Sequence, residues 1–333
     1  MISDVEKRFR TRPKAELHVH LEGALPLEFL NLLAAAKGRE PIMPDIFAFK
    51  GFEEFALCFF ATTGLLEDEE DFYQAARAFM QMQAAENIVY TECSFMPAFH
   101  VKRGVAPEAM FRGLYAGLRE GMWQHNVKVR LLFSMSRMFG AEAAEETFAY
   151  IRQFPDNLIL GIDLAGMEVA DSILPFAPYF EKARAMGLET VAHAGEFAGP
   201  DHVKQTIEIL QPKRIGHGLG AALDDRVCRL LTEKDIALEI SPSSNVLLGA
   251  AASYEDHPLA KLAEIGVPVT LNTDDPVFFS TSLSKEYSLA HQRMGIDMAC
   301  LADILANGFR YSFLEPEEKT RWMVHEKKEP HHA

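Results

Sequence analysis

Short apolar segments rich in β-branched residues alternate along the chain with longer amphipathic stretches. There are eight such segments, and polar residues lie at or near their ends: 15–20, 88–95, 127–134, 158–164, 188–194, 213–218, 236–241 and 267–273. Several are nearly continuous hydrophobic runs, which is typical of parallel strands buried on both faces. The stretches between them, such as 71–86, have helical periodicity and are rich in Ala, Glu, Met and Gln. The pattern predicts an α/β fold, a (β/α)8 TIM barrel formed by residues 1–333 as a single domain.

The longest insertion, residues 25–71, lies between the first two predicted strands. It contains an aromatic-rich segment, GFEEFALCFF, at residues 51–60. One interpretation is additional core packing. The other is a helical lid over the mouth of the barrel, with Phe52, Phe55 and Phe59 facing a bound ligand. We expect the lid, because the insertion is longer than a connection between two strands needs.

Composition narrows the class of partner. The chain of 333 residues has 33 Lys and Arg against 48 Asp and Glu, a formal charge of −15, so it offers no net basic surface to a nucleic acid polymer. A small nucleobase or nucleoside, which carries no phosphate, is not excluded. The four cysteines include no C-x-x-C pair, which disfavours a cysteine zinc site. Because the N-terminus lacks an apolar signal segment and no apolar run approaches 18 residues, we expect a cytoplasmic protein without a membrane partner.

Histidines and acids gather where the predicted strands end. The first strand ends His18-Val19-His20, and because side chains alternate along a strand, both imidazoles point to the barrel interior. The fifth predicted strand has His193 at its end, with Glu196 close behind it. The sixth has His217, and the eighth is followed by Asp274 and Asp275. Barrel enzymes keep their chemistry at the face where these strand ends meet. Burying imidazoles beside carboxylates without a cation would leave many polar atoms unsatisfied, so we predict a metal site.

The donor types narrow the choice of metal. Imidazole and carboxylate ligands without thiolate suit Zn²⁺ best, with Fe²⁺, Co²⁺ and Mn²⁺ as alternatives. Three imidazoles and one aspartate would leave room for a water, whose pKa the metal lowers to about 7. His217 and Glu196 then become candidates for a base and an acid. Spacing alone does not decide which histidine is not a ligand.

Six motifs along the chain carry a family resemblance: PKAELHVHLEGAL (13–25), GIDLAGME (161–168), HAGE (193–196), RIGHG (214–218), ISPSSN (240–245) and LNTDDP (271–276). In this order they resemble the adenosine deaminase family of the metal-dependent amidohydrolase superfamily. The resemblance extends from residue 13 to about residue 316. Any one motif alone would be weak, whereas the set is highly specific.

The resemblance implies a role for each matched residue. It implies that one zinc ion is bound by His18, His20, His193 and Asp274. Glu196 would protonate purine N1 while a hydroxide attacks C6, and His217 would orient and deprotonate the zinc-bound water. Asp275 would hydrogen-bond N7, and the backbone N–H of Gly166 would meet N3. The substrate contacts implied are thus His20, Glu22, Gly166 and Asp275.

Two positions, Glu22 and Ser241, depart from the usual family pattern, and a third, Gly216, separates this chain from the adenine branch. Glu22 stands where typical adenosine deaminases carry an aspartate that meets the ribose, and glutamate is familiar there in the adenine and aminodeoxyfutalosine branches. Gly216 stands where the adenine branch tends to have aspartate, and a glycine leaves space for a substituent on N9. Ser241 replaces a cysteine, which we interpret as a packing change. On balance we expect deamination of adenosine to inosine and ammonia; the alternatives are adenine deaminase and an aminodeoxyfutalosine-type deaminase.

Two rival classes are disfavoured. Binuclear amidases and phosphotriesterases commonly bridge their metals with a lysine, and no lysine lies at the end of the fourth predicted strand. A catalytically inactive relative would normally have lost a ligand or the acid, yet every such residue is present. We therefore expect a zinc-dependent aminohydrolase, with one Zn²⁺ per subunit, whose partner is a small purine nucleoside or base.

Overall fold

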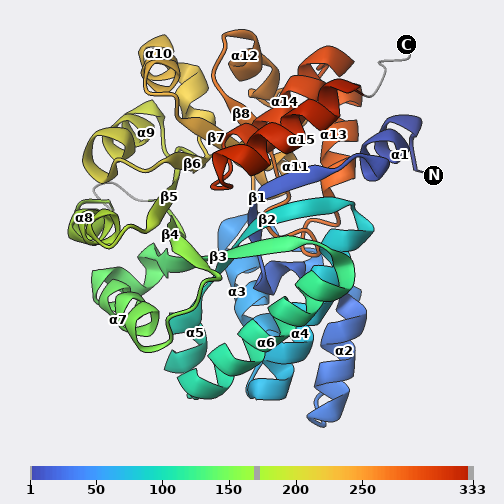
Figure 1. Cartoon of the computed structure of the whole chain (residues 1–333), viewed down its shortest axis with the longest axis vertical. Helices are drawn as coiled ribbons and strands as arrows, with labels where there is room; N and C mark the ends of the chain where they lie inside the picture. The colour runs from blue at the N-terminus through green and yellow to red at the C-terminus, as the bar shows by residue number, and fades with distance from the viewer. Residues whose placement is uncertain (1, 169–172, 329–333) are drawn as a thin grey trace.

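A computed structural model describes residues 2–168 and 173–328 of the chain (Figure 1). Within them, eight parallel strands follow one another around a barrel in sequence order. The strands are β1 (Lys14–His20), β2 (Ile88–Phe95), β3 (Lys128–Ser136), β4 (Ile159–Ala165), β5 (Glu189–Ala194), β6 (Arg214–His217), β7 (Ala237–Ile240) and β8 (Val269–Leu271). This confirms the predicted α/β barrel, and each observed strand begins and ends within two residues of its predicted bounds.

The ring is completed between the last strand and the first. Val19 pairs with Asp274 in a parallel bridge, the N–H of His20 donates to the carbonyl of Asp274 at 2.8 Å, and the N–H of Asp274 donates to the carbonyl of His18 at 3.1 Å. Closure therefore sets Asp274 directly beside the two histidines of β1.

Helices surround the strands in Figure 1. They are α1 (Asp4–Thr11), α2 (Leu27–Ala36), α3 (Gly51–Thr63), α4 (Glu69–Ala85), α5 (Pro97–Lys102), α6 (Pro107–His125), α7 (Gly140–Gln153), α8 (Ala177–Ala185), α9 (Pro200–Gln205), α10 (Asp225–Glu233), α11 (Pro242–Leu247), α12 (Leu259–Glu264), α13 (Leu283–Gln292), α14 (Met298–Arg310) and α15 (Pro316–Lys328). None of the described helices combines the length and the apolar character that crossing a membrane would need.

The insertion between β1 and β2 is helical. It contains α2, the short helix η2 (Pro44–Phe47) and α3, and α4 begins at its end. The buried side of α3 packs Phe55 and Phe59 against Leu248, Phe278 and Phe279, in an aromatic cluster separate from the main cores around the barrel. The insertion thus carries its own small core and rests on the loops that follow β7 and β8.

Candidate active site

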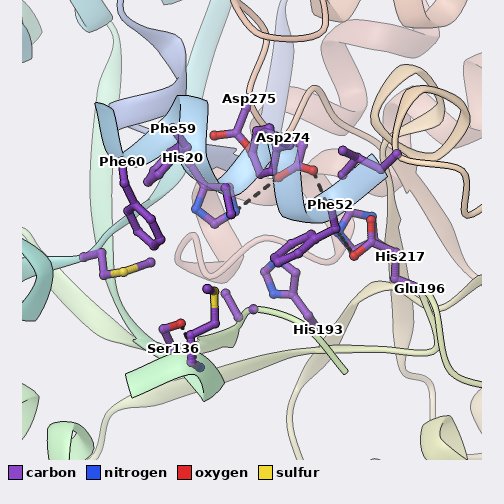
Figure 2. Close-up of a pocket in the computed structure, with 17 residues that line it drawn as sticks. His20, Phe52, Phe59, Phe60, Ser136, His193, Glu196, His217, Asp274 and Asp275 are labelled. Atoms are coloured by element: carbon purple, nitrogen blue, oxygen red, sulfur yellow. Dashed lines mark hydrogen bonds and ion pairs between the residues drawn. The ribbon is translucent and has the colours of Figure 1, made fainter. Parts of the chain in front are cut away.

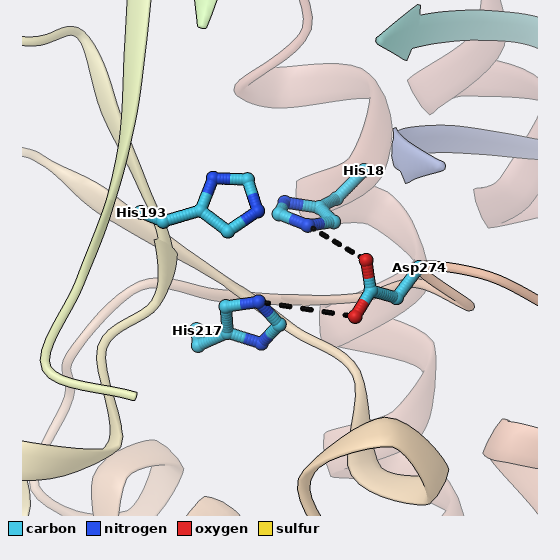
Figure 3. A group of neighbouring side chains, drawn as sticks. All are labelled: His18, His193, His217 and Asp274. Atoms are coloured by element: carbon cyan, nitrogen blue, oxygen red, sulfur yellow. Dashed lines mark ion pairs between the residues drawn. The ribbon is translucent and has the colours of Figure 1, made fainter. Parts of the chain in front are cut away.

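Four strand ends bring their polar side chains together at the mouth of the barrel. Figure 3 shows three imidazoles around one carboxylate: His18, His193, His217 and Asp274. One ligand atom from each lies within 4.8 Å of the others, and His20, Asp274 and Asp275 form a second such group. The structure therefore brings together all the residues that the sequence pointed to as metal ligands, and His217 with them.

The backbone is unusual at two of these residues. His217 has φ +61° and Asp274 has φ +64°, in the left-handed region that residues other than glycine seldom adopt. The side chain of Asp274 is also fixed, because the hydroxyl of Ser244 donates to its Oδ2 at 2.6 Å. Residues held in such conformations are concentrated at functional sites, where surrounding structure maintains the strain.

Two of the histidines are oriented by buried carboxylates behind them. His18 Nδ1 lies 2.9 Å from Glu239 Oε2, and His193 Nδ1 lies 3.1 Å from Asp163 Oδ1. A carboxylate can only accept, so each Nδ1 carries the proton and each Nε2 lone pair faces the centre of the cluster. Metal-binding histidines are commonly held in this way.

Arg214 keeps one of these carboxylates charged. Its guanidinium donates to Glu239 and to Glu92, and Nη1 donates to the carbonyl of Tyr311 at 2.9 Å. Burial alone would raise the pKa of Glu239, but Arg214 and His18 outweigh it and lower that pKa. Glu239 is therefore a permanent acceptor for His18.

The charges of the cluster fit a bound cation. Burial would lower the pKa of His18, yet Asp274 and Glu239 raise it well above its ordinary value. Burial likewise opposes the shift at His20, whose pKa Asp275 and Asp274 raise to about 9. Carboxylates thus outweigh desolvation, and the buried His18 Nε2 faces Asp274 Oδ1 at 3.4 Å. Imidazole nitrogens, an aspartate and surplus negative charge together suit a divalent metal ion.

Glu196 has the properties of a buried acid. Its Oε1 is buried without a hydrogen-bond partner, and its Oε2 lies 3.7 Å from His217 Nε2. Burial, followed by the charges of Asp274 and Glu168, raises the pKa of Glu196 well above its ordinary value. A carboxyl group that stays protonated at neutral pH can donate a proton to a ligand.

Glu168 holds the loop that carries Glu196, a role that sequence analysis missed. Its carboxylate accepts the backbone N–H groups of Glu196 at 3.1 Å, Phe197 at 3.2 Å and Ala198 at 2.7 Å. The only signal in the sequence was its place at the end of the GIDLAGME motif.

Arg137 was missed as well. It donates to the carbonyl of His193 at 2.7 Å and to those of Leu164 and Gly166 at 3.4 and 3.3 Å. These bonds join the ends of β4 and β5, so they fix the backbone on which Gly166 and His193 lie. No local pattern marks such a residue, because its partners are carbonyl groups on other strands.

Asp275 also presents an unpaired carboxyl oxygen. Its Oδ1 is buried without a partner, and burial, followed by the charge of Asp274, raises its pKa well above the ordinary value. A Cβ atom at Gly23 would lie 1.7 Å from this oxygen. The glycine of the HLEGAL motif is therefore required for Asp275 to occupy its place.

These groups open into one cavity with about 590 Å³ of empty space, part of it exposed to solvent. Its polar lining is His20, Ser136, Gly166, His193, Glu196, His217, Asp274 and Asp275, and its apolar lining is Phe52, Phe55, Ala56, Phe59, Phe60, Met96, Met138, Ala165 and Leu248. Figure 2 shows the rings of Phe52 and Phe60 turned into the same space as His20, His193 and Glu196. Phe52, Phe55 and Phe59 of α3 thus line the same cavity as the histidine and aspartate cluster.

Glu22 and Gly216 lie elsewhere than the sequence suggested. Glu22 Oε1 accepts the backbone N–H of Met96 at 2.9 Å and lies 3.3 Å from His100 Nε2, and Glu22 is not among the residues that line the cavity. A Cβ at Gly216 would lie 2.8 Å from His18 Cε1 and 3.2 Å from His193 Cγ. The glycine thus makes room for the histidines of the cluster, a role other than the space for an N9 substituent that we expected from the sequence.

Comparison with known proteins adds independent findings. Residues 13–326 match the sequence model of the adenosine deaminase family. An aminodeoxyfutalosine deaminase of Streptomyces coelicolor is 33% identical over 318 residues, which cover 93% of this chain and 82% of the relative. An adenine deaminase of Sinorhizobium medicae is 32% identical over 314 residues, which cover 93% of this chain and 97% of the relative.

A solved structure shows the same similarity in three dimensions. The crystal structure of an adenine deaminase from Arthrobacter aurescens superposes with a TM-score of 0.91 at 28% identity. The match covers 96% of this chain and 99% of the other. The likeness therefore includes the barrel, the insertion and the strand ends together.

Proposed function

The chain belongs to the adenosine deaminase family, and we propose that within it the protein hydrolyses the 6-amino group from free adenine, giving hypoxanthine and ammonia. It is an aminohydrolase, an enzyme that cleaves a carbon–nitrogen bond. The observation that supports the reaction most directly is the buried, unpaired Oε1 of Glu196 beside the histidine and aspartate cluster.

The metal of this proposal is Zn²⁺, held by four residues: His18, His20, His193 and Asp274. When bound, zinc would acidify a water and so supply the nucleophile at neutral pH. The carboxylates behind His18 and His193 hold the two rings with Nε2 toward that position. Fixed ligands of this kind spare the site any reorganisation during the reaction.

Two protonated carboxyl groups would bind the purine ring, and one of them would also activate it. Glu196 donates its proton to N1, which makes C6 electrophilic, and its raised pKa favours the protonated form that this step needs. In the 9H tautomer of adenine, N7 is an acceptor, so Asp275 would be protonated to bind it, and its pKa is raised in the same direction. The N–H of Gly166, on a strand end whose carbonyl accepts from Arg137, would donate to N3.

We prefer free adenine to adenosine as the proposed substrate for three reasons. Glu22, the residue expected near a ribose, is engaged by Met96 and His100 outside the cavity lining. Away from the metal cluster the lining is mostly apolar, with Ser136 as its hydroxyl group, and offers little to a ribose diol. Among the relatives, adenine deaminases match along nearly their whole length.

Aminodeoxyfutalosine is the second candidate. It is favoured by the relative of that name, which is 33% identical to this chain. The phenylalanines of α3 would also give an apolar surface to a large substituent on N9.

The test compares kcat/KM of the zinc-loaded protein for adenine, adenosine, 2′-deoxyadenosine, 5′-methylthioadenosine and aminodeoxyfutalosine. We expect adenine to exceed each nucleoside by about 10-fold or more, the scale on which the fit of a pocket discriminates. A higher value for aminodeoxyfutalosine would replace the first candidate by the second. No ammonia release from any of the five would contradict the proposed function, provided that zinc is bound.

A further inference from the structure

His217 is held in a different way from the other histidines of the cluster. The Nδ1 atoms of His18 and His193 face carboxylates, which can only accept a proton. The Nδ1 atom of His217 instead lies 3.0 Å from the side-chain amide nitrogen of Asn245. An amide group has a donor end and an acceptor end, so the consequence depends on which end faces the ring.

A backbone group settles the direction of this amide. The N–H of Leu259 lies 3.1 Å from His257 Nδ1, and because a backbone N–H can only donate, that nitrogen must accept. The ring proton of His257 is then on Nε2, which lies 3.3 Å from Asn245 Oδ1. The amide oxygen is thereby used as the acceptor, and the amide NH₂ is left to donate to His217 Nδ1.

The surroundings keep the chain of hydrogen bonds intact. Asn245 has no exposed surface, His217 is 1% exposed and His257 is 4% exposed, so water does not compete for these atoms. Burial also lowers the pKa of His257 to about 4, so its ring stays neutral and can accept from Leu259. Every polar atom along the path from Leu259 to His217 Nδ1 then has one defined donor or acceptor.

We propose that Asn245 and His257 are positioning residues that hold His217 with its proton on Nε2, as a hydrogen-bond donor directed at the metal site. His217 Nε2 lies 3.7 Å from Glu196 Oε2 and 3.9 Å from Asp274 Oδ2, so this proton faces the reaction centre. A nitrogen that carries a proton has no lone pair for a metal. This agrees with the family resemblance, which left His217 out of the ligand set.

The inference also changes the role of His217, and in this it rests on the proposed function. A neutral ring with the proton on Nε2 cannot take a second proton there from the attacking water. It can donate a hydrogen bond to the water oxygen and orient it toward C6. His217 then acts as an orienting donor, in place of the base that the family resemblance implied, and the proton that the water loses before the attack goes to solvent.

The first test reads the tautomer directly. Long-range ¹H–¹⁵N NMR of the histidine rings in the zinc-loaded protein should show His217 protonated on Nε2, and His18 and His193 protonated on Nδ1. The His217 signals are assigned from their loss in His217→Gln. Protonation of His217 on Nδ1 would overturn the proposal. The spectrum needs no turnover, so this test of the tautomer remains valid even if the protein does not deaminate adenine.

Asn245→Asp is the sharpest variant, because a carboxylate can only accept. His217 must then carry its proton on Nδ1, which the same NMR experiment detects. For the best substrate we expect kcat to fall on the order of 100-fold or more while KM changes little, as for other enzymes whose histidine adopts the wrong tautomer. An unchanged His217 spectrum in Asn245→Asp, or an unchanged kcat, would contradict the proposal.

A matched pair at His257 keeps the test valid if Asn245→Asp does not fold. Glutamine supplies both an oxygen for the N–H of Leu259 and an NH₂ for Asn245, whereas leucine supplies neither. We expect His257→Leu to lower kcat by about 10-fold, a loss typical for groups that orient a site residue. His257→Gln should restore most of that loss. Equal kcat in both variants and the wild type would show that His257 only fills space.

Discussion

The barrel side and the helix side of the cavity hold their side chains by different forces. On the barrel side, buried polar atoms bind partners on other strand ends, as His18 binds Glu239 and His193 binds Asp163. On the helix side, Phe55 contacts Phe279 with ring centroids 5.4 Å apart and Phe278 at 5.6 Å, without any directional bond between them. Hydrogen bonds specify one geometry, whereas aromatic contacts tolerate several.

The difference suggests that the two sides of the cavity have different roles in catalysis. The barrel side sets which ring nitrogen of each histidine carries the proton, so substitutions there should abolish or strongly slow the chemical step. The side formed by α3 excludes water and selects for shape, so changes there should alter substrate binding before they alter the chemical step. We therefore propose α3 as a lid, and the predictions below compare the two sides.

Removal of the metal should give the largest effect. His18→Ala deletes a proposed ligand and leaves Glu239 Oε2 without its histidine partner. We expect loss of zinc, loss of detectable deamination and a lower Tm, because coordination contributes to folding. Zinc content by atomic emission and Tm by calorimetry are the measurements. Wild-type protein stripped by a chelator should regain activity on addition of zinc, whereas His18→Ala should not. Full zinc content in His18→Ala would show that the ligand set is wrong.

Glu196→Gln should come next. An amide of the same shape cannot donate an acidic proton to N1, so kcat should fall by about 1,000-fold, within the range that general acids contribute. Zinc content and Tm should stay close to wild type, because Glu196 Oε1 has no protein partner to lose. A kcat close to wild type would remove Glu196 from its role as the acid.

Glu168→Gln should have a smaller effect and a diagnostic pH dependence. The carboxylate of Glu168 contributes to the raised pKa of Glu196, so removing its charge should lower that pKa. A general acid loses its proton as pH rises, and the alkaline limb of kcat/KM should therefore move to lower pH. The expected loss of kcat at neutral pH is about 10-fold, as for other groups that orient a site residue.

Glu145→Gln is the matched control for this prediction, because Glu145 is an exposed carboxylate on α7 that pairs with Lys182. It should leave the pH profile unchanged. An alkaline limb that stays in place in Glu168→Gln would show that Glu168 does not act on Glu196.

The helix side should give the mildest kinetic change. Phe55→Ala removes a ring that lines the cavity and packs in the cluster around Phe278, so KM should rise by several-fold while kcat changes little. Stability should fall by about 3 kcal/mol, because the ring leaves a void. Phe55→Leu, which keeps much of the volume, separates the two effects: its Tm should recover more than its KM. Unchanged kinetics in both variants would mean that α3 is only core.

Much of this protein could be predicted from local patterns. Parallel strands buried on both faces need continuous apolar runs, so Ile88–Phe95 could be predicted residue for residue. The side chains at strand ends could be predicted because strand periodicity and the common edge of a parallel barrel bring His18, His20 and Asp274 to one face. These inferences depend only on neighbours in sequence and on a known architecture.

Tertiary structure alone decided the remaining features, which concern the direction of side chains between distant segments. Glu22 turns away from the cavity to Met96, Gly216 faces His18, and Glu168 reaches the loop of Glu196. The state of His217 depends on Asn245, which lies in α11, and on His257, which lies in the loop between α11 and α12. A hydrogen bond depends on where two atoms meet in space, and no periodicity along the chain encodes which end of an amide faces a ring.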